Sequence, residues 1–573
     1  MVLTSEAWRL WAKTYSDFGR GAGGENQGAR LWLALPQHLR DAADVGERLV
    51  LEWVPRAVQQ RLAAACHGSV DDAARLVGFL AGVHDLGKAD VAFASQIEGS
   101  PEHGWLWEQV RALPSCPPNM GWVPEPRPRH AEVSDLILRR ELHRRFPEVD
   151  LAGIISCSST AGCHHGRLSD LGRTDNPRAG RARELSAWLD RHGSQWACLW
   201  TSMLDDILER TGATPVLEQV LAAGGLGIAD QLLLCGLITA ADWIASNQEL
   251  FPLTESGRHP SDDSRADDAL QRLRLTRAWQ PEPTTCPPFR RRFSWPGSAE
   301  LRPCQCAAVK AAASTDGPCL LIIEEEMGQG KTEAALLAAE ILAGNLGSGG
   351  VAFALPTMAT ADSMFSRVRS WVETLEDDGS VSHSLFLGHS RAWLEPENER
   401  LIRQTRSVNG RGTQAVVAHE WFTGKRGMLA EFTVSTIDQV LMTALATRYV
   451  TMRHLGVAGK VVILDEVHSY DVFTSGYLVR TLTWLAAHGV SVILLSATLA
   501  SGLRQQLEDA YAEGLGVNPV PESATPAPSA NTSLAALKGR GRRRQTQVRR
   551  PDEVPQYPRI SLTGQHGARF TPI

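Results

Sequence analysis

The chain has 573 residues, enough for several hydrophobic cores, and its 43% hydrophobic and 21% charged residues are ordinary for a globular protein. A net charge of −6 excludes a general attraction to nucleic acid, so any such binding needs local basic surface. The start, Met1 to Lys13, has no long apolar run, and stretches such as Leu232 to Ala241 are too short to span a bilayer. We therefore expect a cytoplasmic protein with no membrane contact.

The ten cysteines are scattered and form no C-x-x-C sets, and the closest pair is Cys304 and Cys306. This pattern indicates neither a zinc ribbon nor a disulfide framework. We expect reduced and mostly buried thiols.

The first part of the chain predicts an all-α domain over residues 1–255. Helix-like apolar spacing recurs in Pro55 to Ala65, Asp71 to Val83, Glu132 to Phe146 and Pro215 to Ser246. Gly224 and Gly225 are expected to divide the last of these. From 256 to 298 the composition shifts to Pro, Ser, Asp and Arg, which predicts a linker.

Residues 299–516 predict an α/β domain with a parallel sheet. Short apolar strands alternate there with helical stretches: Cys319 to Ile323, Val351 to Leu355, Phe432 to Ser435, Val461 to Leu464 and Val492 to Leu495. Residues 517–573 are rich in Pro, Ala and Ser and then basic, and we interpret them as a disordered basic tail or the start of a further domain.

The helical part contains several potential metal ligands. These are His38, His84, Asp85, His130, His164, His165 and Asp242. A dinuclear hydrolytic site needs several imidazoles and a carboxylate that can bridge two ions, so the set is informative where a single His-Asp pair is a common structural contact. His164 and His165 can reach one site only from a helix end or an irregular turn, which Gly162 and Gly166 permit.

Asp242 lies among small and apolar neighbours in Thr239 to Ser246. A carboxylate in such surroundings is costly unless it is neutralised. A bound metal ion would neutralise it.

The α/β part carries the signature of a nucleotide-binding loop. Met327-Gly328-Gln329-Gly330-Lys331-Thr332 follows a strand and opens a helix, so backbone amides and Lys331 can hold phosphates while Thr332 coordinates magnesium. Asp465 and Glu466 follow another strand, where Asp465 can bind magnesium through water and Glu466 can activate the attacking water. We expect ATP with Mg²⁺ as the ligand.

In the helical part the order of motifs resembles the HD nuclease domain of the type I CRISPR-associated helicase-nucleases, the Cas3 family. The motifs are an early His, His-Asp-x-Gly-Lys at 84–88, Arg-His-x-Glu at 129–132, His-His-Gly at 164–166 and Ala-Asp-Trp-Ile-Ala-Ser at 241–246, and Leu10 to Lys13 resembles the family's opening. Within that family the motifs resemble the subtype I-E form.

The resemblance implies two divalent metal ions that share Asp85. One would be held by His38, His84, Asp85 and Asp242, and the other by Asp85, His130, His164 and His165. It also implies that Lys88 positions the scissile phosphate or attacking water, that Ser246 supports the site, and that the ions activate water against a DNA phosphodiester. The imidazole-rich shell favours a transition metal (Mn, Fe, Co or Ni) over magnesium.

The second part resembles superfamily 2 helicases of the DExH type. Leu301 to Gln305 is similar to their adenine-sensing motif, with Gln305 reading the base, although an ordinary surface Gln is the alternative. Motifs similar to their DNA-backbone and coupling motifs supply Thr357, Thr360, Thr436, Asp438, Gln439, Ser496 and Thr498. Further basic candidates for DNA contact are Arg167 to Arg183 and Lys538 to Arg550, for which a solvated loop or tail is the alternative.

Two departures from the family pattern affect the expected activity. Glu325 and Glu326 place negative charge at the start of the phosphate loop, which would weaken nucleotide binding if their side chains face the phosphates. No sequence resembling a second RecA-like domain follows 558–561, so we expect impaired unwinding unless that domain, with its arginine finger, is supplied in trans.

The leading hypothesis is a CRISPR interference effector that degrades single-stranded DNA after recruitment by a guide-RNA surveillance complex of the Cascade type. One alternative is an HD phosphohydrolase acting on nucleotides, which the adjoining helicase motifs disfavour because they imply a polymer substrate. Another is a non-catalytic remnant that binds ATP and DNA. Salt-dependent binding of single strands without metal-dependent product would favour the remnant.

Overall fold

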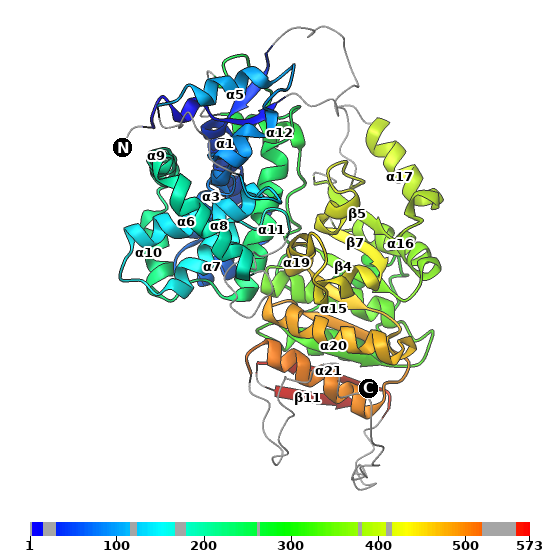
Figure 1. Ribbon diagram of the computed structural model, residues 1–573. Helices are drawn as coiled ribbons and strands as arrows, with labels where there is room; N and C mark the ends of the chain where they lie inside the picture. Colours follow the sequence, from blue (N-terminus) through cyan, green and yellow to red (C-terminus); the bar gives the residue numbers. More distant parts are fainter. Residues whose placement is uncertain are drawn as a thin grey trace, which may run out of the picture.

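The computed structural model describes residues 3–14, 30–114, 123–166, 179–259, 264–375, 381–407, 415–517, 557–565 and 567–572. Two bodies lie side by side, a helical domain built from the first part of the chain and an α/β domain built from the second (Figure 1). The fold class expected from the sequence is therefore confirmed, with a helical unit followed by a largely parallel sheet.

The helical domain surrounds one hydrophobic core to which most of its helices contribute. A short antiparallel hairpin of β1 (Trp11–Thr14) and β2 (Trp32–Ala34) lies beside the helices. The helices are α1 (Leu35–Arg48), α2 (Arg56–Ala65), α3 (Val70–Gly82), α4 (Val91–Ala94), α5 (Gly104–Arg111), α6 (His130–Arg145), α7 (Leu151–Ala161), α8 (Ala179–His192), α9 (Ala197–Thr211), α10 (Thr214–Ala222), α11 (Ile228–Ala245) and α12 (Arg265–Leu273).

Local sequence explains where these helices begin and end. Ser69 caps α3 through a reciprocal pair of hydrogen bonds with Asp72, the capping box that satisfies two otherwise unpaired backbone amides. Gly224 and Gly225 separate α10 from α11 and have φ values of +93° and +94°, which only glycine adopts without strain. The break expected from these two glycines is thus confirmed.

Helix α11 lies at the centre of the helical domain and packs against α1, α3 and α7. It has 18 residues, and by length and composition it could cross a membrane. The shorter apolar run considered from the sequence, Leu232 to Ala241, could not. However, 67% of α11 is buried inside the protein, and the helix carries Asp242 near its C-terminal end. These features are those of the core helix of a folded domain.

The segment 256–298, expected to be a linker, is partly helical. Helix α12 lies within it and packs on α1. Arg265 is buried and donates from Nε and Nη2 to the two carboxylate oxygens of Asp41, at 2.9 and 3.0 Å. This two-bonded ion pair attaches the start of the segment to the helical domain.

The α/β domain contains, within the described ranges, a nine-stranded sheet of order β11-β10-β3-β9-β8-β4-β7-β5-β6. Its strands are β3 (Leu320–Glu324), β4 (Val351–Leu355), β5 (His383–Gly388), β6 (Val416–Val417), β7 (Phe432–Thr436), β8 (Val461–Leu464), β9 (Val492–Ser496), β10 (Arg559–Gly564) and β11 (Gly567–Pro572). All pairs from β3 to β6 are parallel, and the five central strands are buried along their whole length, as expected for a sheet covered on both faces.

Helices cover both faces of this sheet (Figure 1). They are α13 (Phe289–Arg292), α14 (Pro303–Ala313), α15 (Lys331–Leu346), α16 (Met358–Val372), α17 (Pro396–Ser407), α18 (Asp438–Leu441), α19 (Val450–Ala458), α20 (Val472–Ala487) and α21 (Ser501–Gly514). Helix α19 lies at the boundary between the domains and packs against α11.

The last strands differ from the expectation for residues 517–573. Strand β10 pairs antiparallel with β3, and β11 pairs antiparallel with β10, so 559–564 and 567–572 extend the sheet of the α/β domain itself. The physical reason is an ion-pair cluster: Glu324, at the end of β3, accepts from Arg559 at 2.8 Å and from Arg504 at 2.6 Å, and all three are buried. Residues 518–556 lie outside the described part of the chain.

Candidate functional site

Four potential ligands from three helices converge in the helical domain. His38 comes from α1, His84 and Asp85 follow the end of α3, and Asp242 comes from α11. One ligand atom of each lies within 4.8 Å of those of the others. Since α1, α3 and α11 pack against one another, the helical core itself sets this geometry.

A second group lies beside the first. It consists of His130 at the start of α6 and of His164 and His165 in the turn after α7, again with ligand atoms within 4.8 Å of one another. Gly166 follows with φ +81°, which confirms the irregular turn expected from the two glycines around the histidine pair.

Asp85 lies between the two groups and offers one carboxylate oxygen to each. Its Oδ2 is 3.0 Å from His38 Nε2 and 3.3 Å from His84 Nε2. Its Oδ1 is 3.3 Å from His130 Nε2 and 3.5 Å from His164 Nε2. This is the arrangement that a carboxylate bridging two ions requires.

The charge of Asp85 is maintained by its neighbours. Burial by itself would raise the pKa of this carboxyl, but the positive charges of Lys88 and His84 outweigh burial and hold the pKa well below its usual range. Lys88 Nζ lies 2.5 Å from Asp85 Oδ2, and burial lowers the pKa of this lysine to about 8. Asp85 is therefore ionised and available as a ligand at neutral pH.

Most of the imidazoles are neutral, the state that binds metal ions. Burial lowers the pKa of His38 to about 3 and that of His130 to about 4, and it holds the pKa of His164 well below the ordinary value. His84 differs, because the carboxylates of Asp85 and Asp242 outweigh burial and raise its pKa to about 9. A cation at this position would replace the proton that His84 otherwise holds.

Two buried atoms that face this centre show that the site suits a cation. Among the described residues, His84 Nε2 and Asp85 Oδ1 are buried and have no hydrogen-bond partner, although an unpaired buried polar atom is costly. A bound ion would satisfy both atoms. The donor set of nitrogen and carboxylate oxygen fits a transition metal such as Mn, Fe, Co or Ni.

The polar neighbours of Asp242 orient its carboxylate. Ser246 Oγ donates to Asp242 Oδ1 at 2.7 Å, the supporting position expected for this serine. Lys13 Nζ lies 3.9 Å from the same oxygen. Sequence reasoning did not assign Lys13 a place at the site, although Leu10 to Lys13 was noted as a family-like opening; only the fold brings β1 next to α11.

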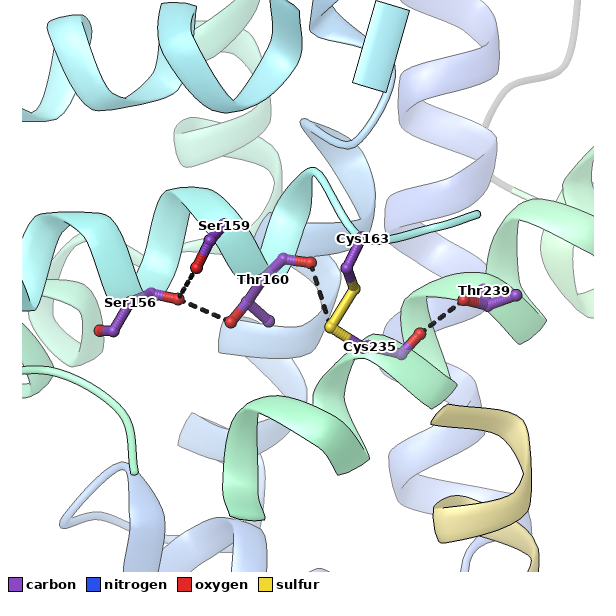
Figure 2. The surroundings of a disulfide bond; sticks show 6 residues. All are labelled: Ser156, Ser159, Thr160, Cys163, Cys235 and Thr239. Carbon is purple, nitrogen blue, oxygen red and sulfur yellow. Dashed lines mark hydrogen bonds between the residues drawn. A yellow bond between two sulfur atoms is a disulfide. The ribbon is translucent and has the colours of Figure 1, made fainter. Parts of the chain in front are cut away.

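A disulfide joins the two ligand-bearing segments and corrects the expectation of free thiols. Cys163, directly before His164, is bonded to Cys235 of α11, with a Cα–Cα distance of 5.7 Å (Figure 2). The Thr160 carbonyl oxygen lies 3.6 Å from Cys235 Sγ. The two cysteines are 72 residues apart, so spacing along the chain carried no signal for the bond. Seven other cysteines are free within the described ranges.

The nucleotide residues line one cleft of about 600 Å³ on the α/β domain. Gln305, Gly328, Gly330, Lys331, Thr332, Asp465 and Glu466 all contribute to its wall. Gly330 has φ +86° and precedes α15, so the N-terminus of this helix points its amides at the cleft. This volume is adequate for a nucleotide.

The phosphate loop is held by hydrogen bonds between its own residues. Lys331 Nζ donates to the carbonyl oxygens of Glu325 and Glu326 at 2.6 and 3.0 Å. The Glu325 side chain turns back and accepts from the amide of Glu326 at 2.9 Å. Glu326 is exposed. Neither glutamate lines the cleft, so their charges are less adverse to a polyphosphate than the sequence suggested.

Asp465 and Glu466 connect the cleft to the next strand. Burial and the neighbouring Glu466 raise the pKa of Asp465 to about 6. His468 Nδ1 lies 3.3 Å from both Glu466 Oε2 and Ser496 Oγ, and Ser496 Oγ also donates to the Thr498 carbonyl at 2.8 Å. His468 thus connects the strand-end acids to the Ser496–Thr498 segment, a role that the sequence analysis did not give it.

Two of the DNA-contact candidates serve as a helix cap. Thr357 caps α16, accepting from the amide of Thr360, and the two hydroxyls lie 2.9 Å apart. Both threonines remain exposed.

Three further candidates lie at and after the end of β7. Thr436 ends β7 and is buried, Asp438 begins α18, and Gln439 accepts from Arg453 of α19 at 2.9 Å. Of the basic stretches, 167–178 and 538–550 lie outside the described residues.

The fold and the two candidate sites define a two-domain protein in which a helical domain with clustered metal-ligand side chains adjoins an α/β domain with a P-loop. Family models agree with this division. Residues 11–251 match the model described as "Cas3, HD domain", and residues 302–505 match the DEAD/DEAH box helicase model.

Known proteins are similar to this chain over both of its domains. A "CRISPR-associated nuclease/helicase Cas3" of Streptococcus thermophilus is 30% identical over 511 residues, which are 86% of this chain and 53% of that protein. A crystal structure of T. fusca Cas3 with ATP superposes with a TM-score of 0.72 at 25% identity and covers 98% of this chain and 55% of that one. A chain of a "CRISPR RNA-guided surveillance complex, pre-nicking" superposes with a TM-score of 0.61 at 23% identity, covering 98% of this chain and 53% of that one.

The chain therefore carries a Cas3-type HD domain followed by a DEAD/DEAH box helicase domain. It spans about half the length of the curated relatives it matches, 53% in each of two cases.

Proposed function

We propose that this protein is a CRISPR interference effector whose HD domain is a metal-dependent nuclease on single-stranded DNA, adjoined by an ATP-dependent helicase domain. The observation that carries the proposal is the position of Asp85, whose two oxygens each lie within 3.5 Å of the imidazoles of a different donor group. The matches to Cas3 nuclease/helicases and the adjoining ATPase domain support a polymer substrate over a free nucleotide.

His38, His84, Asp85 and Asp242 would hold one divalent ion, and Asp85, His130, His164 and His165 a second. Bound there, the ions would supply an activated water and neutralise the charge on the phosphodiester oxygens. Lys88, 2.5 Å from Asp85, orients that carboxylate and adds a cation next to the scissile phosphate. Ser246 holds Asp242 in its ligand orientation.

In the helicase domain, Lys331 and the amides at the start of α15 would bind the phosphates of ATP, and Thr332 and Asp465 its Mg²⁺. Lys331 must leave the carbonyls of Glu325 and Glu326 to reach them. Glu466 would orient the attacking water, and Gln305 would bind the adenine base of ATP. Thr357, Thr360, Thr436, Asp438, Gln439, Ser496 and Thr498 would contact DNA or couple its binding to ATP.

The proposed partners are single-stranded DNA and a guide-RNA surveillance complex of the Cascade type. The protein would act in the cytoplasm and resemble the subtype I-E form. A structural neighbour that belongs to such a complex motivates the second partner. Efficient ATP turnover would also require the arginine finger of a second RecA-like domain.

The test is cleavage of labelled circular single-stranded DNA by the protein after removal of metal and re-addition of Mn²⁺, Co²⁺, Ni²⁺ or Mg²⁺. We expect cutting with a transition metal and no requirement for ATP. Asp85→Ala should reduce the rate of DNA cutting by about 10³-fold or more, because both donor groups lose their shared ligand. Asp71→Ala, at an exposed position in the first turn of α3, controls for general effects of removing a carboxylate.

Three other outcomes would contradict the proposal. Hydrolysis of nucleotides in place of DNA would indicate the phosphohydrolase. Salt-sensitive binding of single strands without product under any metal would indicate a non-catalytic ATP- and DNA-binding protein. Equal cutting by the parent and Asp85→Ala would place the nuclease elsewhere.

A further inference from the structure

The helicase domain contributes an aromatic residue to the edge of the HD metal centre. Tyr449 lies directly before α19 and contacts Gly166, the glycine that follows the His164–His165 pair. A Cβ atom on Gly166 would lie 2.4 Å from Tyr449 Cα and 2.5 Å from Tyr449 Cδ1. The tyrosine thus occupies the space against which the histidine turn closes.

The same ring reaches the other ligand-bearing segment. Tyr449 and Trp243 have ring centroids 5.3 Å apart at an interplanar angle of 64°, an edge-to-face contact. Trp243 directly follows Asp242 in α11. One side chain of the helicase domain therefore contacts both the turn that carries His164 and His165 and the helix end that carries Asp242.

Tyr449 is held in this position from its own domain. Lys425 Nζ lies 4.2 Å from the centroid of its ring, and Arg448 Cζ lies 4.9 Å from it, both within the range of cation–π contacts. Helix α19, which Tyr449 precedes, packs closely on α11, where a Cβ atom at Gly236 would lie 2.8 Å from Leu455 Cβ. The two domains are therefore in van der Waals contact next to the ligands.

The backbone of Tyr449 has a conformation that side chains rarely adopt. Its φ and ψ are +61° and +29°, in the left-handed region. Such a conformation in a bulky residue costs free energy and persists where the surrounding contacts determine it. Here those contacts are Gly166, Trp243 and the two cations.

We propose that Tyr449 is a positioning residue that the helicase domain supplies to the HD metal centre. It holds the turn of His164 and His165 on one side and the end of α11 with Asp242 on the other, so that both ligand groups keep the separation that Asp85 can bridge. The inference rests on the proposed metal centre. Residues that orient metal ligands in this indirect way change metal affinity by about 10- to 100-fold when they are removed.

The test is the affinity of the full chain for Mn²⁺ or Ni²⁺, measured by titration calorimetry after metal removal. Tyr449→Gly removes the ring and at the same time relieves the left-handed backbone, so it should fold. We expect it to weaken metal binding by about tenfold or more. Tyr449→Phe retains the ring and should bind within about twofold of the parent. Phe473→Ala removes a ring that is 71% exposed on α20 and should match the parent.

A second variant approaches the contact from the other side. Gly166→Ala places a methyl group against Tyr449 and should weaken metal binding in the same direction. Melting temperature and binding of a fluorescent ATP analogue show whether each variant is folded. Parental metal affinity in either folded Tyr449→Gly or folded Gly166→Ala would refute the positioning role.

Failure of the proposed nuclease remains distinguishable from failure of this inference. If the parent binds metal but cuts no DNA, the nuclease proposal fails while the comparison of affinities still decides the role of Tyr449. If the parent binds no transition metal at all, both proposals are wrong.

Discussion

Two aspartates only five residues apart show how neighbours decide the charge of a buried carboxyl. Asp85 faces Lys88 and several imidazoles, which keep it ionised. Asp90 is equally buried, but its partners are the backbone amides at the start of α4, including that of Ala92 at 2.7 Å. Burial outweighs these amides and raises the pKa of Asp90 to about 7. The first carboxyl suits a metal ligand, and the second is a pH-sensitive helix cap.

Replacement of Asp90 by Asn should stabilise the protein at alkaline pH. Because the folded pKa of about 7 exceeds the unfolded value of 3.8, the folded state binds the extra proton between these values. The stabilising contribution is complete below pH 4 and is lost as the pH rises through 7. Asp90→Asn retains a capping oxygen and cannot ionise, so its gain over the parent at pH 8 should be on the order of 3 kcal/mol.

Urea unfolding at pH 5 and pH 8, followed with a spectroscopic probe in the HD domain, measures the difference in unfolding free energy between Asp90→Asn and the parent. The gain should be smaller at pH 5 than at pH 8, because pH 5 lies only about one unit above the unfolded pKa while pH 8 lies above both pKa values. An equal gain at both values would show that Asp90 is ionised in the folded protein throughout.

At the scale of elements, Glu324 attaches the last strands to the sheet. It ends β3 and accepts from the amide of Leu499, from Arg504 of α21 and from Arg559 of β10. All three charged residues are buried, so the two guanidinium groups depend on this carboxylate for their compensation. A sequence pattern of five apolar residues and a glutamate could not indicate partners 180 and 235 residues away.

Loss of this carboxylate should destabilise the α/β domain strongly. Glu324→Ala leaves Arg504 and Arg559 buried without the carboxylate that pairs with both of them, which should cost about 3–5 kcal/mol of unfolding free energy. Glu326→Ala, at an exposed position two residues away, should change it by less than about 0.5 kcal/mol. Denaturant unfolding, followed with a spectroscopic probe in the helicase domain, gives the unfolding free energy of each variant. Similar unfolding free energies for the two variants would mean that β10 does not depend on Glu324.

At the scale of the whole molecule, the metal centre and the nucleotide cleft are built from separate cores. The donors belong to the helical core, and Lys331, Asp465 and Glu466 to the sheet and its helices. The domains contact each other through α11 and α19, with Tyr449 at the ligands. The two candidate sites therefore lie in different domains, and Tyr449 of the α/β domain contacts the segments that carry the donor groups.

The two sites should therefore be separable by mutation. Lys331→Ala should reduce ATP binding by about 100-fold or more, because the phosphates lose their main cation. It should leave metal-dependent cutting of circular single-stranded DNA within about twofold of the parent. Asp85→Ala should show the reverse pattern. Binding of a fluorescent ATP analogue and the DNA assay measure both, and loss of cutting in folded Lys331→Ala would show that the nuclease depends on the nucleotide site.

Local sequence signals were sufficient to predict the class of each domain, the central strands, and the candidate metal ligands and phosphate-loop residues. These follow from local signals: apolar periodicity, a glycine-rich loop between strand and helix, and His and Asp in a recurring order. Four features come from long-range packing and pairing alone. Asp85 offers one oxygen to each donor group, Lys13 and Tyr449 border the donors, Cys163 is bonded to Cys235, and β10 pairs with β3. Those contacts join segments far apart in the chain, and their positions are set by helix packing and sheet pairing, which leave no pattern at short range.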